Sequence, residues 1–182
     1  MQKSGILPTI DHVNLFLTWG EVEGIVCSGI DKGKKTTYAL LDERVPPTRE
    51  LCREEALARL ASRYFQSHSP AQLQDFVWWS GLTATECRLA INLIKTELIT
   101  ETFDSREYFI HQSWKGKNES KPVLRLLPAF DEYLISYKNR TDVLPLEHHP
   151  KAFNRFGTFY PVILYNGKII GNWSRSIKKN TI

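Results

Sequence analysis

The stretch of residues 63–82 constrains the fold more than any other part of this chain. It completes one amphipathic helix, breaks at Ser69-Pro70, continues as a second helix rich in aromatic residues and stops at Gly81. Thr83 then starts a third helix, with Glu86 at the spacing of a capping box. This order is typical of a helix-turn-helix, so nucleic-acid recognition is the first hypothesis.

The same pattern extends over residues 52–112, where three helices are closed by a β-hairpin. Apolar residues step by three and four along the first helix, and a turn at residues 104–106 separates two strand-like segments. The arrangement predicts a winged-helix domain. The expected elements are helices at 53–66, 71–79 and 84–98 and strands at 99–103 and 107–112.

A shorter version of this pattern precedes it in residues 1–45. A helix is expected at 9–23, then a hairpin over 24–42 with the basic loop 31–35 between its strands. Because an amphipathic helix leads at once into a hairpin in both places, the two units resemble a repeat. We interpret the first as a partial winged helix, a helix plus its wing, followed by a linker at 42–50.

The C-terminal region, residues 113–182, is predicted to be rich in β-structure. A strand at 124–128 runs into a helical turn at 129–135, and a hairpin is expected at 161–173. Asn166-Gly167 supplies the two positive φ angles that a type I′ turn needs. The predicted fold class is therefore α+β: a tandem winged helix, the first one partial, followed by part of an antiparallel β-barrel.

Composition narrows the function classes. The net charge is +4, but residues 105–182 carry 13 Lys and Arg against 6 Asp and Glu, whereas residues 1–104 carry 11 against 14. A basic half suits a polyanion partner, and surplus lysine for solubility explains it as well. No apolar stretch approaches the roughly 20 residues of a membrane span, and no signal peptide is visible, so we expect a cytoplasmic protein without a membrane partner.

Cysteine usage argues against a disulfide framework or structural zinc. The three cysteines, Cys27, Cys52 and Cys87, are widely spaced and form no Cys-x-x-Cys pair. Glu147 with His148-His149 is a weak metal candidate, because adjacent histidines point to different sides. We expect neither a metal nor a cofactor.

The third predicted helix and the two hairpin loops hold the candidate DNA contacts. Cys87 and Ile94 belong to the apolar stripe of that helix, and polar residues step by three and four along its other side. Arginine and asparagine match guanine and adenine edges in the major groove, and lysines at hairpin tips neutralise phosphates. A solvated surface would look similar. The candidates are Lys32, Lys34, Lys35, Thr85, Arg88, Asn92, Lys95 and Arg106.

Two further groups of residues have competing interpretations. Trp78-Trp79 with Phe76 could form a base-stacking platform, but in a helical unit they are expected to be core. Asp131 and Glu132 lie in an apolar segment, where a buried acid needs a partner such as Lys138 or Arg140.

Four blocks of sequence, in order, resemble the bacterial winged-helix DNA-binding family that includes the AlkZ-like DNA glycosylases. The resemblance covers about residues 15–175. Two of the blocks are Arg63-Tyr64-Phe65 through Trp78-Trp79-Ser80-Gly81-Leu82-Thr83 and residues 126–135 with Tyr137-Lys138-Asn139-Arg140. The other two blocks are residues 38–46 and 159–173.

The resemblance implies a C-shaped protein of tandem winged helices followed by a β-barrel. Active members excise alkylated bases or unhook interstrand crosslinks, and others are described only as DNA-binding proteins or regulators. In the glycosylases a Gln-x-Gln or Gln-x-Asp motif in the N-terminal third positions the hydrolytic water. This chain is expected to begin after that third and to end inside the barrel.

Gln72-Leu73-Gln74 matches that motif in letters but falls on the second helix of the later unit. The catalytic role is therefore not carried over, and Gln72 and Gln74 remain weak candidates. We expect a protein that binds double-stranded DNA without catalysis by this chain. The alternatives are a DNA glycosylase and a regulator or protein-interaction winged helix; whether the chain is an enzyme, and its oligomeric state, stay open.

Overall fold

The structure, a computed structural model, describes residues 9–114, 116 and 121–176 and combines helices with short antiparallel sheets. It is thus an α+β protein, as predicted. The chain divides into two compact units, residues 1–50 and residues 51–182. The break lies where the sequence predicted a linker.

The first unit contains the predicted helix and hairpin. The Thr9 hydroxyl accepts the backbone N–H of His12 at 3.3 Å and caps the helix. The strands are shorter than predicted, and a helical turn occupies part of the predicted linker. Among the described residues of this unit no side chain is fully buried, and Leu15 and Trp19 of the helix are more than 60% exposed. Its elements are α1 (Ile10–Val22), β1 (Val26–Ser28), β2 (Tyr38–Leu40) and α2 (Leu41–Arg44).

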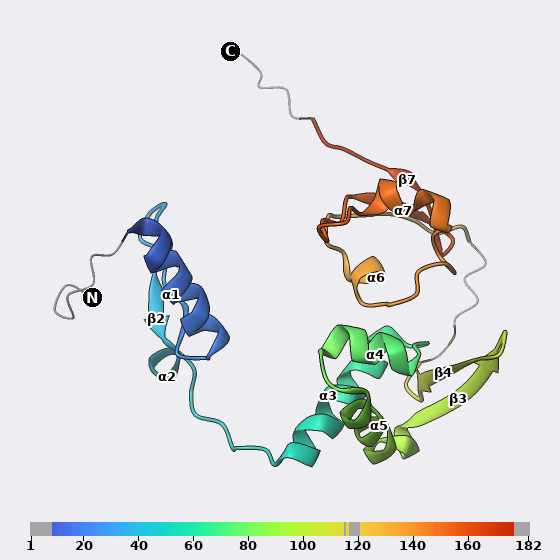
Figure 1. Ribbon diagram of the computed structural model, residues 1–182, viewed down its shortest axis with the longest axis horizontal. Coiled ribbons are helices and arrows are strands. Elements are labelled where there is room, and N and C mark those ends of the chain that lie inside the picture. The colour runs from blue at the N-terminus through green and yellow to red at the C-terminus, as the bar shows by residue number, and fades with distance from the viewer. Residues whose placement is uncertain (1–8, 115, 117–120, 177–182) are drawn as a thin grey trace. The chain divides into compact units, whose positions relative to one another are not determined.

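The second unit begins with the three helices and the hairpin that the sequence predicted. Figure 1 shows these helices gathered together, with the hairpin extending beside them. Gly81 adopts φ +69° and ends the second helix, because this left-handed conformation suits glycine. The elements are α3 (Arg53–His68), α4 (Leu73–Ser80), α5 (Ala84–Leu93), β3 (Leu98–Phe103) and β4 (Arg106–His111).

Aromatic rings fill the space between the three helices. Tyr64 and Phe65 of α3 and Phe76 of α4 are fully buried, and the Phe76 ring lies 5.0 Å and 5.5 Å from the other two. Burying one ring of this size stabilises a fold by about 1.5–3 kcal/mol. The small residues Ala61 and Ala90 are also fully buried, at the core between α3 and α5. The aromatic spacing along residues 63–82 therefore builds the core.

The third helix ends five residues earlier than predicted, at Leu93. A 3-10 turn, η2 (Lys95–Glu97), then leads into β3. The carbonyls of Thr96 and Glu97 accept the side-chain and backbone N–H groups of Gln112 at 2.7 and 2.8 Å. Within this turn the N–H of Glu97 donates to the carbonyl of Ile94 at 2.8 Å, an i→i−3 bond in place of the i→i−4 bond of an α-helix.

The C-terminal part of the second unit holds a three-stranded antiparallel sheet with the order β5-β6-β7. Asn166 and Gly167 have φ angles of 45° and 79°, as the predicted type I′ turn requires. Leu134, Leu144 and Val162 form its core. Closure into a barrel stays a prediction. The elements are β5 (Leu124–Leu127), α6 (Glu132–Ile135), η3 (Leu146–His148), α7 (His149–Ala152), β6 (Val162–Tyr165) and β7 (Lys168–Asn172).

Hydrogen bonds connect the three helices with the segment after α6. The Tyr137 hydroxyl donates to the carbonyl of His68 at 2.9 Å, and the Lys138 N–H donates to the carboxylate of Asp75 at 2.8 Å. Burial raises the pKa of Tyr137 to about 12, so its hydroxyl keeps the proton that it donates. The domain boundary predicted near residue 112 lies inside this unit and stays a prediction.

Candidate nucleic-acid interface

The outer face of α5 carries the polar row that the sequence predicted. Thr83 and Glu86 form the capping box that fixes the start of the helix. Thr85, Arg88 and Asn92 are all exposed. Within the described part of the chain, no hydrogen bond or ion pair holds the Arg88 guanidinium, so its donors are available to a ligand.

The acidic residue next to this row has its charge offset. Glu86 is ion-paired with Arg53 of α3 and also accepts the Thr83 hydroxyl at 2.8 Å. The hydrogen bond from Arg53 lowers the pKa of Glu86, so the carboxylate stays ionised. The paired guanidinium reduces the repulsion that this carboxylate would otherwise exert on a phosphate near α5.

Lys95 differs from the prediction, because it lies in η2 and not on α5. Its side chain is exposed. Because α5 ends at Leu93, Lys95 does not continue the helical row of Arg88 and Asn92. The prediction that Lys95 contacts a base as part of that row assumed that α5 continues to residue 98, and α5 ends at Leu93.

The loop of the first hairpin presents three exposed lysines. Lys32 and Lys35 pair through their backbones at 3.0 and 3.2 Å, and Gly33 adopts φ +65° at the tip. Lys34 completes this tight turn. The first unit therefore has a compact cationic tip of its own.

Arg106 has a partner that the sequence did not reveal. Its guanidinium donates two hydrogen bonds, of 2.9 and 3.0 Å, to Asp142, which also accepts the Tyr108 hydroxyl. The bond from Arg106 lowers the pKa of Asp142. Arg106 thus connects the β3–β4 hairpin to the C-terminal segment. Its guanidinium is paired with Asp142 and is not free at the tip of the hairpin.

The three aromatic residues of α4 separate into different environments. Phe76 is fully buried, and Trp79 is half-buried with its ring 5.0 Å from Tyr64, as expected for core residues. Trp78 is 50% exposed, so the core assignment is wrong for this residue. Its Nε1 donates to the carbonyl of Ile135 at 2.9 Å.

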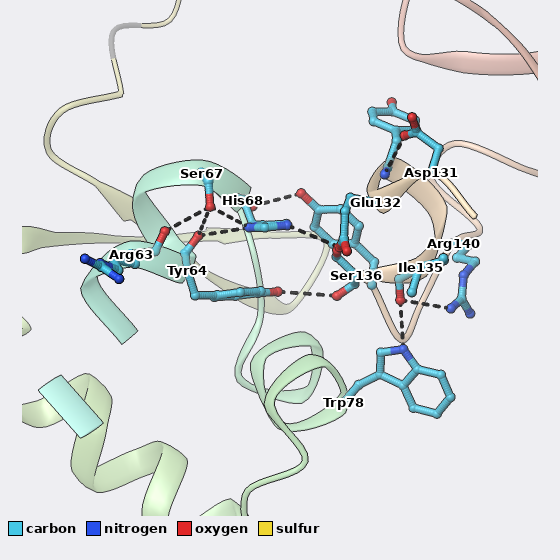
Figure 2. A network of polar contacts seen from close by, with 12 residues as sticks. Arg63, Tyr64, Ser67, His68, Trp78, Asp131, Glu132, Ile135, Ser136 and Arg140 are labelled. Carbon is cyan, nitrogen blue, oxygen red and sulfur yellow. Dashed lines mark hydrogen bonds and ion pairs between the residues drawn. The ribbon is translucent and has the colours of Figure 1, made fainter. Parts of the chain in front are cut away.

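The carboxylates of Asp131 and Glu132 have local partners instead of Lys138 or Arg140. Asp131 caps α6 by accepting the N–H of Tyr133 at 2.9 Å. Glu132 accepts the Ser136 hydroxyl and lies 3.7 Å from His68 Nε2, in the network shown in Figure 2. Asp131 therefore fixes the start of α6, and Glu132 joins this helix to the end of α3.

The Arg140 side chain is engaged by backbone carbonyls and aromatic rings. Its guanidinium bonds the carbonyls of Leu134 and Ile135 and lies 5.3 Å from the rings of Phe153 and Phe159. Burial lowers the pKa of Arg140. This cation is thus a structural member of the C-terminal core.

Asp75 is the buried acid that sequence reasoning missed. It is 4% exposed and accepts the backbone N–H groups of Gln72 and Lys138 at 2.9 and 2.8 Å. Its position three residues after Gln72, at the start of a helix, was the available signal. Gln72 and Asp75 line a cavity of about 290 Å³ together with tyrosines such as Tyr108, whereas Gln74 is exposed.

Two other features bear on site chemistry. Among the residues that the structure describes, no three His, Cys, Asp or Glu side chains are grouped as a metal ion would require. His148 pairs only with its neighbour Glu147, at 3.7 Å. Within the same described ranges no helix has the length and apolarity to cross a membrane.

Comparisons with known proteins agree with one another. The family model described as "DNA glycosylase AlkZ-like" matches residues 14–181. An "Interstrand DNA cross-link repair glycosylase" of Streptomyces sahachiroi is 25% identical over 170 residues, which are 85% of this chain and 46% of that protein. The solved structure of the Streptomyces sahachiroi DNA glycosylase AlkZ matches with a TM-score of 0.73 at 22% identity, over 90% of this chain and 48% of the other. The chain thus spans about half the length of these relatives.

Proposed function

Because the chain belongs to the AlkZ-like DNA glycosylase family, we propose that it binds double-stranded DNA as part of a DNA-repair protein. In this proposal α3, α4, α5 and the β3–β4 hairpin act as a winged helix. Residues 9–44 are a partial second one, and β5, β6 and β7 belong to a barrel.

The observation that carries the proposal is the unpartnered polar face of α5. Arg88 has free donors, Thr85 and Asn92 lie beside it along the helix, and Arg53 offsets the charge of the neighbouring Glu86. A helix face of this kind can contact phosphates and base edges in a major groove. Lys32, Lys34 and Lys35 supply further phosphate contacts from the first unit. A non-specific Kd on the order of 10⁻⁴–10⁻⁶ M at physiological salt is typical of such electrostatic binding.

Replacing Arg88 by alanine is expected to weaken duplex binding. A phosphate contact would lower the slope of log K against log salt by roughly 0.9, and a bidentate base contact would cost about 1–3 kcal/mol on the preferred sequence. Fluorescence anisotropy with a labelled duplex measures both effects. Arg59→Ala removes another exposed arginine, on α3, and is expected to change little. If wild type and Arg88→Ala bind the duplex with equal affinity, α5 does not contact DNA through Arg88, and the alternative that α5 binds another protein is favoured.

Base excision is the second candidate function, because the relatives are named as glycosylases. The chain's own residues give it less support. Both carboxylate oxygens of Asp75 accept backbone N–H groups, which occupies them structurally. Gln74 is exposed, and Gln72 begins α4 as its N-cap residue. We therefore propose that this chain binds DNA and does not itself activate a water.

The chain is expected to release no 7-methylguanine or 3-methyladenine from alkylated duplex DNA above the buffer rate. A glycosylase needs a group that holds water against the anomeric carbon, and we assign none here. Chromatography of the released bases measures the rate. Release that Gln72→Ala or Gln74→Ala abolishes, while the fold survives, would make excision the function of this chain.

A further inference from the structure

A groove of about 540 Å³ runs between α4 and α5, next to the proposed DNA-binding face. Its floor is apolar and includes Leu73 and Val77 of α4. Three polar side chains, Gln74, Arg88 and Lys138, line it as well. We call this hollow, which the Trp78 indole also lines, the α4–α5 groove. Because Arg88 belongs both to this groove and to the outer face of α5, the two surfaces are continuous.

The polar side chains that line the α4–α5 groove are not used in hydrogen bonds or ion pairs within the described part of the protein. In the described ranges, no hydrogen bond or ion pair engages the side chains of Gln74, Arg88 or Lys138; the Lys138 ammonium only lies 5.5 Å from the Trp78 ring. Among the residues that the structure describes, no carboxylate lines the groove. Two cations and one amide therefore offer donors to a ligand that carries negative charge.

Trp78 is held in place yet remains half exposed. Its Nε1–H donates to the carbonyl of Ile135, which fixes the ring at one edge (Figure 2), and the Arg140 guanidinium lies 5.7 Å from the ring centre. Asp75 positions Lys138 nearby by accepting its backbone N–H. A ring that is already fixed loses little conformational freedom when a flat ligand stacks on it.

The cavity of about 290 Å³ that Asp75 lines provides a contrast. Its tyrosine hydroxyls donate within the protein, Tyr133 to the carbonyl of Gly167 and Tyr137 to that of His68. Arg140 and Asp75 are likewise bonded within the protein. The polar groups of that cavity are therefore engaged within the protein, whereas the α4–α5 groove presents solvent-exposed donors beside an apolar floor.

We propose that the α4–α5 groove binds one unpaired nucleotide of the DNA that α5 contacts, with the base against Trp78 and the phosphates near Arg88 and Lys138. An apolar floor, a fixed aromatic ring and flanking cations are the features with which proteins hold unpaired bases. The inference rests on the proposed DNA-binding function and deepens it, because it specifies a subsite for a base outside the duplex.

The test compares two labelled duplexes that differ only in one bulged thymidine, titrated with the 182-residue chain. Wild type is expected to prefer the bulged duplex. Trp78→Ala is expected to weaken binding to it by about 5- to 150-fold, the loss typical of one stacked base, and to leave the paired duplex unchanged. Trp78→Phe keeps an aromatic ring and should retain most of the preference. Trp114→Ala, at a tryptophan that is 52% exposed and outside the groove, is the matched control.

Lys138→Ala provides a second variant, since its side chain makes no hydrogen bond that the fold needs. It should also reduce the preference for the bulge, and circular dichroism confirms that each variant is folded. A preference that survives in both Lys138→Ala and folded Trp78→Ala, or no preference in wild type, would overturn the groove proposal alone. Absence of binding to the paired duplex by wild type would overturn the proposed function and the groove with it.

Discussion

Replacing Asp75 by alanine is expected to lower the free energy of unfolding of residues 51–182 by about 2–6 kcal/mol. The carboxylate is 4% exposed and accepts two backbone N–H groups, from Gln72 at the start of α4 and from Lys138 after α6. Removing it leaves two N–H donors without an acceptor, each costing about 1–3 kcal/mol where water cannot reach. Urea unfolding followed by circular dichroism measures the change.

Two further variants separate this effect from a simple loss of charge. Asp75→Asn keeps the shape and one acceptor oxygen, so a smaller loss is expected. Glu107→Ala removes an exposed acid from β4 and should change stability by no more than about 0.5 kcal/mol. If Asp75→Ala is as stable as Glu107→Ala, Asp75 does not connect α4 with the C-terminal segment as described.

The elements that sequence patterns predicted well depend on contacts within a few residues. Thr83 and Glu86 predict the start of α5, because the hydrogen bonds of a capping box are completed within one helical turn. Gly81 predicts the end of α4, because a positive φ angle at the end of a helix favours glycine. Asn166-Gly167 likewise specifies its turn by backbone preference alone. Such signals need no knowledge of the rest of the chain.

The features that the sequence patterns did not reveal depend on partners far away in the sequence. Gln112, 16 residues beyond Thr96, donates its side-chain N–H to the Thr96 carbonyl in the turn that follows α5. Arg106 pairs with Asp142, 36 residues later, and so is not free at the hairpin. Trp78 is half exposed because its indole meets the carbonyl of Ile135, 57 residues away, instead of the core.

The candidate site was predictable in part. The exposed row of Thr85, Arg88 and Asn92 follows from helical periodicity, and the resemblance to the AlkZ-like family, confirmed by the family match over residues 14–181, pointed to DNA. The α4–α5 groove was not predictable from sequence patterns, because Lys138 is far from α4 and α5 in the sequence and lines the groove only in the folded chain. The roles of these residues in binding stay predictions.

Changing Lys32, Lys34 and Lys35 together to alanine is expected to have the largest effect on duplex affinity. All three are exposed at the tip of the first hairpin, where no acidic side chain pairs with them in the described part of the chain. Each phosphate that a cation neutralises releases counterions, so losing up to three contacts lowers the slope of log K against log salt by roughly 0.9 for each.

The central claim, electrostatic binding of duplex DNA, is tested most directly by that slope. The binding constant of wild type and of the triple variant is measured by anisotropy at several salt concentrations between about 50 and 200 mM. A variant with alanine in place of Lys121, Lys151 and Arg155, all exposed and outside the proposed contacts, loses the same three charges and controls for the change in net charge. The account predicts a steep slope for wild type and a clearly flatter one for the triple variant; a salt-independent wild type, or equal slopes for both, would contradict it.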